Sequence, residues 1–189
     1  MTDVNVRPAP HPVCDSLLHQ ELSRVEPTAA ERRALERERF FSRNFYVLDT
    51  ETNGFSFYEP IEIAALRFEE GEQVGIHSQY FLPENEITRA SRKIHGLTRK
   101  KLHARGARRI SEGDCRALMR FLNEHQDWPI VAHYAKHDRD QVLMPAFKKA
   151  GIVDKMPDKG RWRCTLNMSE RVPDLEFRDL DSLLKHFGF

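Results

Sequence analysis

Apolar and polar residues alternate in two different rhythms along the chain, and the change of rhythm predicts where strands and helices lie. Residues 44–50, 61–68 and 74–82 are short runs rich in Val, Ile, Leu, Phe and Tyr, which is typical of strands. The short turn EEGEQ joins the second and third runs, so an antiparallel hairpin is predicted. A fourth run, PIVAH at 129–133, follows a helical stretch, and we expect it to lie parallel to the first strand.

Apolar residues at helical spacing fill most of the remaining chain after Pro83. Ser111 or Asp114 is expected to cap one of these helices, and Gly151 to end another. The pattern predicts an α/β fold, with a mixed sheet of three antiparallel strands plus parallel strands, flanked by helices. The predicted helices span about 86–94, 98–103, 111–125 and 138–150, a short segment within 160–172, and a last one from about Asp179.

The first 43 residues differ from the rest. The segment RPAPHP at 7–12 is Pro-rich and predicted to be extended, and a short helix is predicted from Asp15 to about Val25. Thr28 and Glu31 have the spacing of a capping box before a densely charged helix. We expect residues 1–43 to form an arm that is either a solvated surface helix or a segment that binds a protein partner.

Composition narrows the class of protein only a little. Lys and Arg number 30 against 29 Asp and Glu, so the net charge indicates no partner. The three cysteines, Cys14, Cys115 and Cys164, share no metal-like spacing and form no disulfide framework, which fits a reducing compartment. No signal-peptide core and no run of 18 apolar residues occurs, so we expect a soluble cytoplasmic protein without a membrane partner.

The first strand ends in two acids one residue apart, Asp49 and Glu51 in YVLDTETNGF. Strand side chains alternate between faces, so both carboxylates are predicted to project to the same side. Two close carboxylates repel unless a cation lies between them, and their oxygens suit Mg²⁺ or Mn²⁺. A third acid, Asp138, follows the PIVAH strand and can reach this place if the two strands are neighbours. The alternatives are a solvated strand end and an ordinary aspartate at a helix start.

Four segments together resemble the DEDDh-type 3′–5′ exonucleases, the family of the proofreading epsilon subunit of bacterial replicative polymerases. YVLDTETNGF resembles the first motif of that family, and IVAHYAKHDRDQVL at 130–143 resembles the second. ASRKIHGLT at 90–98 resembles an Ile-His-Gly-Ile-Thr segment, and residues 163–189 resemble the stretch that runs from Cys-Thr-Leu to Phe-Gly. The resemblance implies a ribonuclease-H-like exonuclease domain over 44–189.

The same resemblance implies roles for individual residues. Asp49, Glu51 and Asp138 would be the catalytic ligands of two Mg²⁺ or Mn²⁺ ions that hydrolyse a phosphodiester bond. Phe55 could stack on a base, or it could pack as a core residue under its loop. His95 could instead have a structural role through a hydrogen bond. The residues expected to bind substrate are Thr52, Asn53, Gly54, Phe55, His95 and Tyr134.

The third family motif, a general-base histidine five residues before a fourth aspartate, is absent. His186 is followed only by Phe187, Gly188 and Phe189. His133 and Asp138 have the spacing, but they belong to the second motif. Truncation is our preferred interpretation, while a base supplied by a partner and a fold kept without activity stay open. In the second motif, Tyr134 replaces the usual Asn and His137 the usual Phe, and a role for His137 as a substitute base is disfavoured.

Positive charge is concentrated in one segment of the chain. Residues 87–111 contain nine Lys and Arg and no Asp or Glu. Such segregation fits a face that binds the nucleic-acid backbone, although a solvated basic surface is the alternative. We therefore predict a metal-dependent 3′–5′ exonuclease that acts on single-stranded 3′ ends of DNA or RNA, with a polymerase or other protein as partner of the arm. A non-catalytic binding module of the same fold is the other interpretation. The basic residues are Arg89, Arg92, Lys93, Arg99, Lys100, Lys101, Arg105, Arg108 and Arg109.

Overall fold

The computed structural model of the protein describes residues 28, 44–54 and 58–188. The predictions made for the arm at residues 1–43, apart from Thr28 itself, lie outside the described residues. Phe55 lies outside them as well. These predictions therefore stay predictions.

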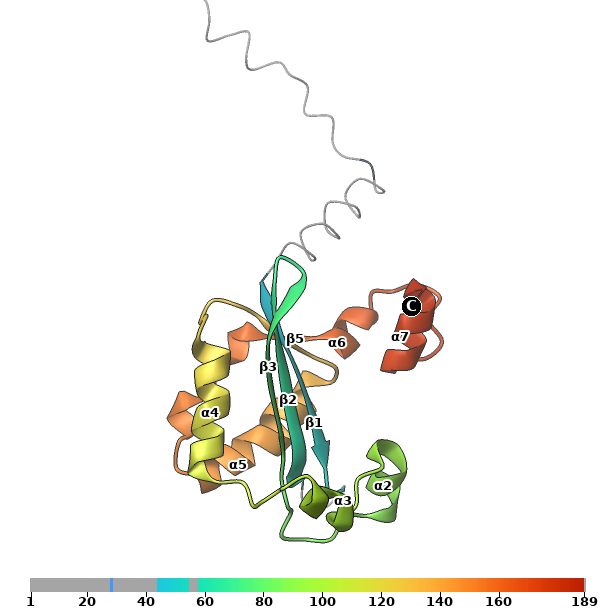
Figure 1. Cartoon of the computed structure of the whole chain (residues 1–189). Helices are drawn as coiled ribbons and strands as arrows, with labels where there is room; N and C mark the ends of the chain where they lie inside the picture. The colour runs from blue at the N-terminus through green and yellow to red at the C-terminus, as the bar shows by residue number, and fades with distance from the viewer. Residues whose placement is uncertain (1–27, 29–43, 55–57, 189) are drawn as a thin grey trace, which may run out of the picture. The chain divides into compact units, whose positions relative to one another are not determined.

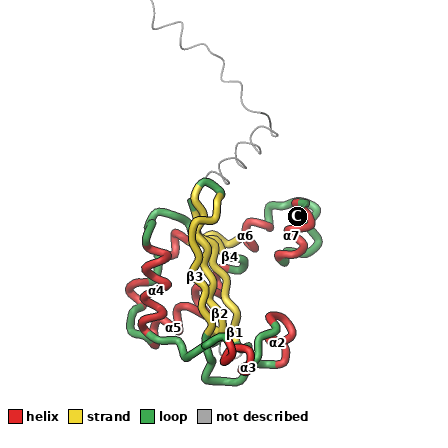
Figure 2. The backbone as a smooth tube through the Cα atoms, in the orientation of Figure 1, coloured by secondary structure: helices red, strands yellow, loops and turns green. Residues whose placement is uncertain are grey.

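A five-stranded mixed sheet organises the described chain (Figures 1 and 2), in the order β3-β2-β1-β4-β5. The first three strands pair antiparallel, while β4 runs parallel to both β1 and β5. The predicted fold class is confirmed, and so is the parallel pairing of the fourth apolar run with the first. The strands are β1 (Phe45–Thr52), β2 (Pro60–Glu69), β3 (Glu72–Tyr80), β4 (Ile130–Ala132) and β5 (Trp162–Cys164).

Helices lie on both sides of this sheet. In Figure 1, α4 and α5 cover one face, α6 and α7 lie on the other side, and α2 and α3 lie at the end where β1 finishes. Ser111 caps α4, and Asp114 completes a reciprocal capping box, so the predicted cap is confirmed. The helices are α2 (Arg89–His95), α3 (Arg99–Ala104), α4 (Glu112–Asn123), η1 (His137–Leu143), α5 (Met144–Lys149), η2 (Val153–Lys155), η3 (Lys159–Arg161), α6 (Thr165–Ser169) and α7 (Leu180–Phe187).

The main core lies between the sheet and the helices α4 and α5. Tyr46 and Leu48 of β1 are buried there with Leu118 of α4 and Phe147 of α5. Side chains alternate along a strand, so the residues between the core positions of β1 project to the other face. The core therefore decides which side of the sheet carries the acids. Among the described residues, no helix is both long and apolar enough to cross a membrane.

Two segments differ in part from the prediction. The short helix predicted within 160–172 is confirmed by α6, but β5, which precedes it and pairs with β4 over three residues, was not predicted because it is too short to show a strand pattern. The predicted helix at 138–150 begins as the π-helix η1 before it becomes α5. Pro145 lacks the N–H that an α-helix would use at this point, and its ring would clash with the carbonyl one turn earlier. The wider winding before it avoids both problems.

Candidate active site

The end of β1 carries two of the three predicted acids. Leu48 and Thr50 point into the protein, so Asp49 and Glu51 share the opposite face, as predicted. The Asp49 side chain is exposed and that of Glu51 is half-buried. Strand alternation alone therefore brings these two carboxylates to one surface.

The third acid, Asp138, reaches the same end of the sheet through β4 and η1. Tyr46 and Val47 of β1 pair in parallel with β4, so both strands finish at the same edge of the sheet. The hydroxyl of Thr50 donates a hydrogen bond of 2.7 Å to Oδ1 of Asp138. The Asp138 side chain is only 2% exposed. This hydrogen bond joins the two motifs directly.

Electrostatics indicate that the three carboxylates act on one another. Burial raises the pKa of Glu51 to about 7, with Asp49, Glu62 and Asp138 adding repulsion. Burial also raises the pKa of Asp138 to about 6, against the opposing hydrogen bond from Thr50. The pKa of Asp49 is raised by desolvation as well, even though its side chain reaches the surface. The carboxylates therefore share one site in which negative charge is not compensated.

This donor set fits a hard cation. None of the three carboxylates forms an ion pair with a described Lys, Arg or His residue. Carboxylates whose pKa is raised by burial and by nearby carboxylates regain their charge when a cation approaches them. As the described side chains stand, however, no group of three or more His, Cys, Asp or Glu residues forms a ready-made metal cage. The chemistry of the donors suits Mg²⁺ or Mn²⁺, and the side chains would have to turn toward the ion.

Sequence reasoning missed a fourth acid at this site, Glu62. It lies directly opposite Glu51 in the antiparallel register of β1 and β2. Like charges in directly opposed positions destabilise a sheet, so this pair is unfavourable without a compensating charge. The alternation of IEIAAL could have indicated the face of Glu62, but only the register shows which residue it opposes.

The loop after β1 is fastened by side chains that the first motif supplies. Asn53 is 4% exposed, its Nδ2 donates to Glu59 at 2.9 Å, and its Oδ1 accepts from the Glu59 backbone N–H at 3.0 Å. Gly54 has a φ of 144°, and a Cβ there would lie 2.4 Å from Cγ2 of Thr88. Asn53 and Gly54 therefore shape the loop and dock it on the N-terminus of α2, while Thr52 ends the strand half-buried.

His95 lies at the end of α2, where its Nδ1 accepts a hydrogen bond of 2.9 Å from the backbone N–H of Leu97. Burial lowers the pKa of His95, although the backbone of Thr52 and the charge of Glu62 oppose this effect. The contact with Leu97 fits the structural role considered for this histidine. Its nearness to Thr52 also keeps it next to the first motif.

Two histidines of the second motif lie near the acids. Nδ1 of His137 lies 2.8 Å from Oε1 of Gln141, and Nδ1 of His133 lies 3.0 Å from Oγ1 of Thr165. Both imidazoles oppose the rise in the pKa of Asp49 that burial causes. The hydrogen bonds orient both rings beside the acid cluster.

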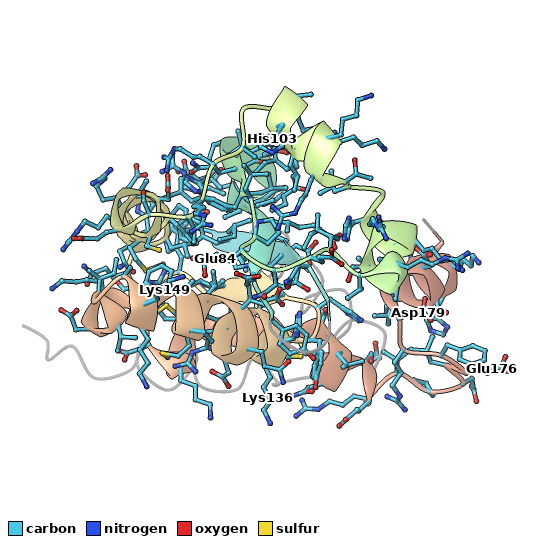
Figure 3. The ribbon with its side chains drawn as sticks, turned by 90° about the horizontal axis from the view of Figure 1, so that it is seen from below. Glu84, His103, Lys136, Lys149, Glu176 and Asp179 are labelled. Atoms are coloured by element: carbon cyan, nitrogen blue, oxygen red, sulfur yellow. The ribbon has the colours of Figure 1, made fainter. Side chains whose placement is uncertain are left out.

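Five residues of the basic segment have partners within the protein. Arg99 donates to the carbonyl oxygens of residues 83, 84 and 85 at 2.8, 3.1 and 2.8 Å. Arg108 binds both carboxylate oxygens of Asp114, at 2.6 and 2.5 Å. Arg109 lies 3.4 Å from the carboxylate of Glu84. The same carboxylate accepts a hydrogen bond of 2.7 Å from Lys149, and both Glu84 and Lys149 are labelled in Figure 3. The two remaining cations with partners are Lys101, on the Gly96 carbonyl, and Arg105, over the Tyr80 ring.

The other four basic residues are exposed, and their side chains make no hydrogen bond or ion pair with any described residue. Three of them lie on α2, next to the loop that carries the first motif, and the fourth lies on α3. Their charges are available to an external anion. Among the described residues, the cations of the basic segment whose side chains have no partner are Arg89, Arg92, Lys93 and Lys100.

A mixed sheet with carboxylates at the end of β1 and the start of η1 is the arrangement expected of a nuclease, and comparison with known families agrees. A family model described as exonuclease (RNase_T) matches residues 46–189. The chain belongs to this exonuclease family, which confirms the family assignment made from the motifs.

The relatives by sequence are large polymerases. DNA polymerase III PolC-type of Thermotoga maritima is 31% identical over 169 residues, which are 88% of this chain and 12% of the relative. The PolC-type protein of Thermotoga petrophila is 30% identical over 151 residues, 79% of this chain and 10% of the relative. The chain thus spans about a tenth of the length of these relatives.

Solved structures share the fold at lower identity. Product-bound exonuclease I has a TM-score of 0.63 and 16% identity, over 76% of this chain and 38% of its own. Exonuclease X in complex with 5′-overhanging duplex DNA has a TM-score of 0.54 and 20% identity, over 76% of this chain and 72% of its own. A 3′-exonuclease that recognises the 3′ end of histone mRNA stem-loop has a TM-score of 0.62 and 13% identity, over 77% of this chain and 70% of its own.

Proposed function

We propose that the chain is a metal-dependent 3′–5′ exonuclease that hydrolyses phosphodiester bonds at single-stranded 3′ ends of DNA or RNA. The observation that carries the proposal is the convergence of Asp49, Glu51 and Asp138 at one end of the sheet, where none of them forms an ion pair with a described residue. Membership of the exonuclease family supports it.

In this proposal the three carboxylates would hold two Mg²⁺ or Mn²⁺ ions. When bound, the ions supply Lewis-acid activation of the scissile phosphate and of the attacking water. Thr50 keeps the carboxylate of Asp138 turned toward β1 through its hydrogen bond. Glu62 adds negative charge beside Glu51 and so favours cation binding at this end of the sheet.

The substrate follows from charge and from the structural relatives. Arg89, Arg92 and Lys93 are free to bind phosphates beside the first motif, and phosphate contacts position a strand without reading its sequence. The similar structures include a complex with DNA and a 3′-exonuclease that recognises histone mRNA, which supports either nucleic acid as substrate. A polymerase or other protein as partner of residues 1–43 stays a prediction, as does a cytoplasmic location.

The experiment is to incubate a 5′-labelled single strand with the chain and Mg²⁺, and to follow the products on a gel. A 3′–5′ exonuclease gives a ladder that shortens from the 3′ end, and a phosphorothioate at the 3′ end slows it. We expect Asp49→Ala to lower the rate by about 10³-fold, because the metal contributes several kcal/mol to the transition state.

Asp154→Ala is the matched control, since Asp154 is an exposed acid whose partner is Lys155 and not the site. Equal trimming by the parent chain and by Asp49→Ala would refute the proposal. If the parent binds single strands and trims none, the binding-module interpretation is supported instead.

A further inference from the structure

Three aromatic rings lie together beside the acid cluster. The rings of Tyr58 and His137 meet edge to face, with centroids 4.7 Å apart. The ring of Tyr134 is nearly parallel to that of His137, with an angle of 8° between the planes and centroids 6.2 Å apart. The rings of Tyr134 and His137 are therefore parallel, and the ring of Tyr58 supports that of His137 from the side.

Tyr134 is held in an unusual backbone conformation for a residue with a side chain. Its φ is 65°, in the left-handed region, which costs free energy for any residue other than glycine. Its carbonyl accepts a hydrogen bond of 2.7 Å from the backbone N–H of His137, and this turn maintains the conformation. The side chain is 46% exposed, so the ring is open to a ligand.

His137 gives this pair of rings a fixed position. Its Nδ1 is hydrogen-bonded to Gln141 at 2.8 Å. The ring of Tyr58 packs against the ring of His137 with the two ring planes at right angles. His137 directly precedes Asp138, and its imidazole is near enough to oppose the rise in the pKa of both Asp49 and Asp138. Because the ring of Tyr134 neighbours that of His137, Tyr134 lies close to the proposed metal ligands.

We propose that Tyr134, supported by His137 and Tyr58, is a stacking platform for an unpaired nucleobase next to the scissile phosphate. The proposal rests on the proposed function and adds a contact with the base. A planar aromatic surface stacks on any base, so the platform favours single strands and tolerates every sequence. The phosphates of the same strand would be bound by the free cations of α2.

The test is binding of a fluorescein-labelled oligothymidylate to the full chain in EDTA, where no hydrolysis occurs. The variants are Tyr134→Phe, which keeps the ring, and Tyr134→Asn, which removes the ring but tolerates a positive φ. We expect Tyr134→Phe to bind like the parent and Tyr134→Asn to bind about tenfold more weakly, as base stacking contributes roughly 1–3 kcal/mol.

Oligonucleotides with one abasic position, scanned along the last nucleotides of the 3′ end, make the test specific. At the position that stacks, removal of the base should weaken binding by the parent about tenfold and leave the affinity of Tyr134→Asn unchanged. If Tyr134→Asn binds the intact strand as well as the parent does, the platform is refuted while the proposed function stands. An equal loss on every abasic strand also refutes it. If the parent binds no single strand at all, the proposed function fails too.

Discussion

Asp114 and Asp138 are two buried aspartates at the starts of helices, yet they have opposite electrostatic properties. Asp114 is 6% exposed, and Asp138 is 2% exposed. Burial acts to raise the pKa of both. At Asp114, hydrogen bonds from Arg108, Ser111 and Gln79 outweigh burial and lower the pKa to about 2. At Asp138 the only hydrogen bond from a described side chain comes from Thr50, and burial raises the pKa to about 6.

The difference separates a structural carboxylate from one that is available for chemistry. Asp114 has a cation, an amide and a hydroxyl as partners, so its charge stabilises the fold. Asp138 is buried beside other carboxylates and forms no ion pair with a described residue, so its charge destabilises the fold until an external ion arrives. The four predictions below test this contrast.

The largest effect is expected from Asp138→Asn. The amide keeps the size of the side chain but removes one of the proposed metal ligands, so activity should fall by about 10³-fold. In EDTA the same variant should be at least as stable as the parent, because a buried and repelled charge is gone. Activity assays measure the loss of catalysis, and urea unfolding in EDTA measures the change in stability. A variant that unfolds more readily than the parent would assign Asp138 to the fold.

Asp114→Asn should show the reverse. The variant loses the ion pair with Arg108 and weakens the capping box at α4. We expect the free energy of unfolding to fall by about 2 kcal/mol, a value that already allows for solvent screening of the exposed Arg108. Trimming activity at a temperature where the variant is folded should stay near that of the parent. Urea unfolding measures the stability, and the gel assay measures the activity. The control is Glu112→Gln, which alters an exposed acid on the same helix. A stability equal to that of the parent would contradict the prediction.

Stability should depend on pH in opposite directions through the two sites. The folded-state pKa values of Glu51 and Asp138, about 7 and about 6, lie above their ordinary values of 4.5 and 3.8. The folded chain therefore binds more protons than the unfolded chain between about pH 4 and 7, and stability in EDTA should fall as pH rises through this window. Asp114 has a lowered pKa, so its contribution is present above about pH 4 and is lost toward pH 2.

Unfolding in urea at pH 5, 6, 7 and 8 measures the first of these trends. Glu51→Gln should flatten the decline, because a titrating group with a folded-state pKa of about 7 is gone. Addition of Mn²⁺ should also flatten it, since the ion binds the ionised carboxylates. The same slope in the parent and in Glu51→Gln, both in EDTA, would show that the acids at the end of β1 do not cause the trend.

The smallest effects are expected from single cations of the basic segment. Arg92→Ala and Lys93→Ala should each reduce the slope of log affinity against log salt by about 0.7 for a single strand, because each removes one phosphate contact. Their stability should change little, since neither has a partner among the described residues. Arg108→Ala should instead lower stability and leave the salt slope unchanged. Identical slopes in all three variants would remove the distinction drawn between free and paired cations.

The sequence predicted the parts of the site that depend on local geometry. Strand alternation was enough to bring Asp49 and Glu51 to one face, and the second motif located Asp138. Glu62 was missed because its nearness to Glu51 depends on the register of a hairpin, which the two strand patterns do not specify. β5 was missed because three paired residues are too few to show a periodicity.

The basic segment shows a different limit. Nine cations without an acid in the same stretch look like one surface, but their partners come from elsewhere in the chain. The carbonyl groups around Arg99 belong to the loop after β3, and Asp114 lies within α4. Charge along the chain can be counted from the sequence, but neutralisation across space cannot.

The π-helix η1 makes the length of this stretch as important as its composition. A π-helical turn can be regarded as an α-helix that contains one additional residue. Deletion of one residue between Asp138 and Phe147, together with a return to α-helical winding, would leave both ends facing as they do now. A return to α-helical winding at the present length would instead rotate one end relative to the other by about 100°. Phe147 in the core and Asp138 beside β1 could then no longer both keep their places. A chain could thus preserve every side chain of the site and still separate the third acid from the first two.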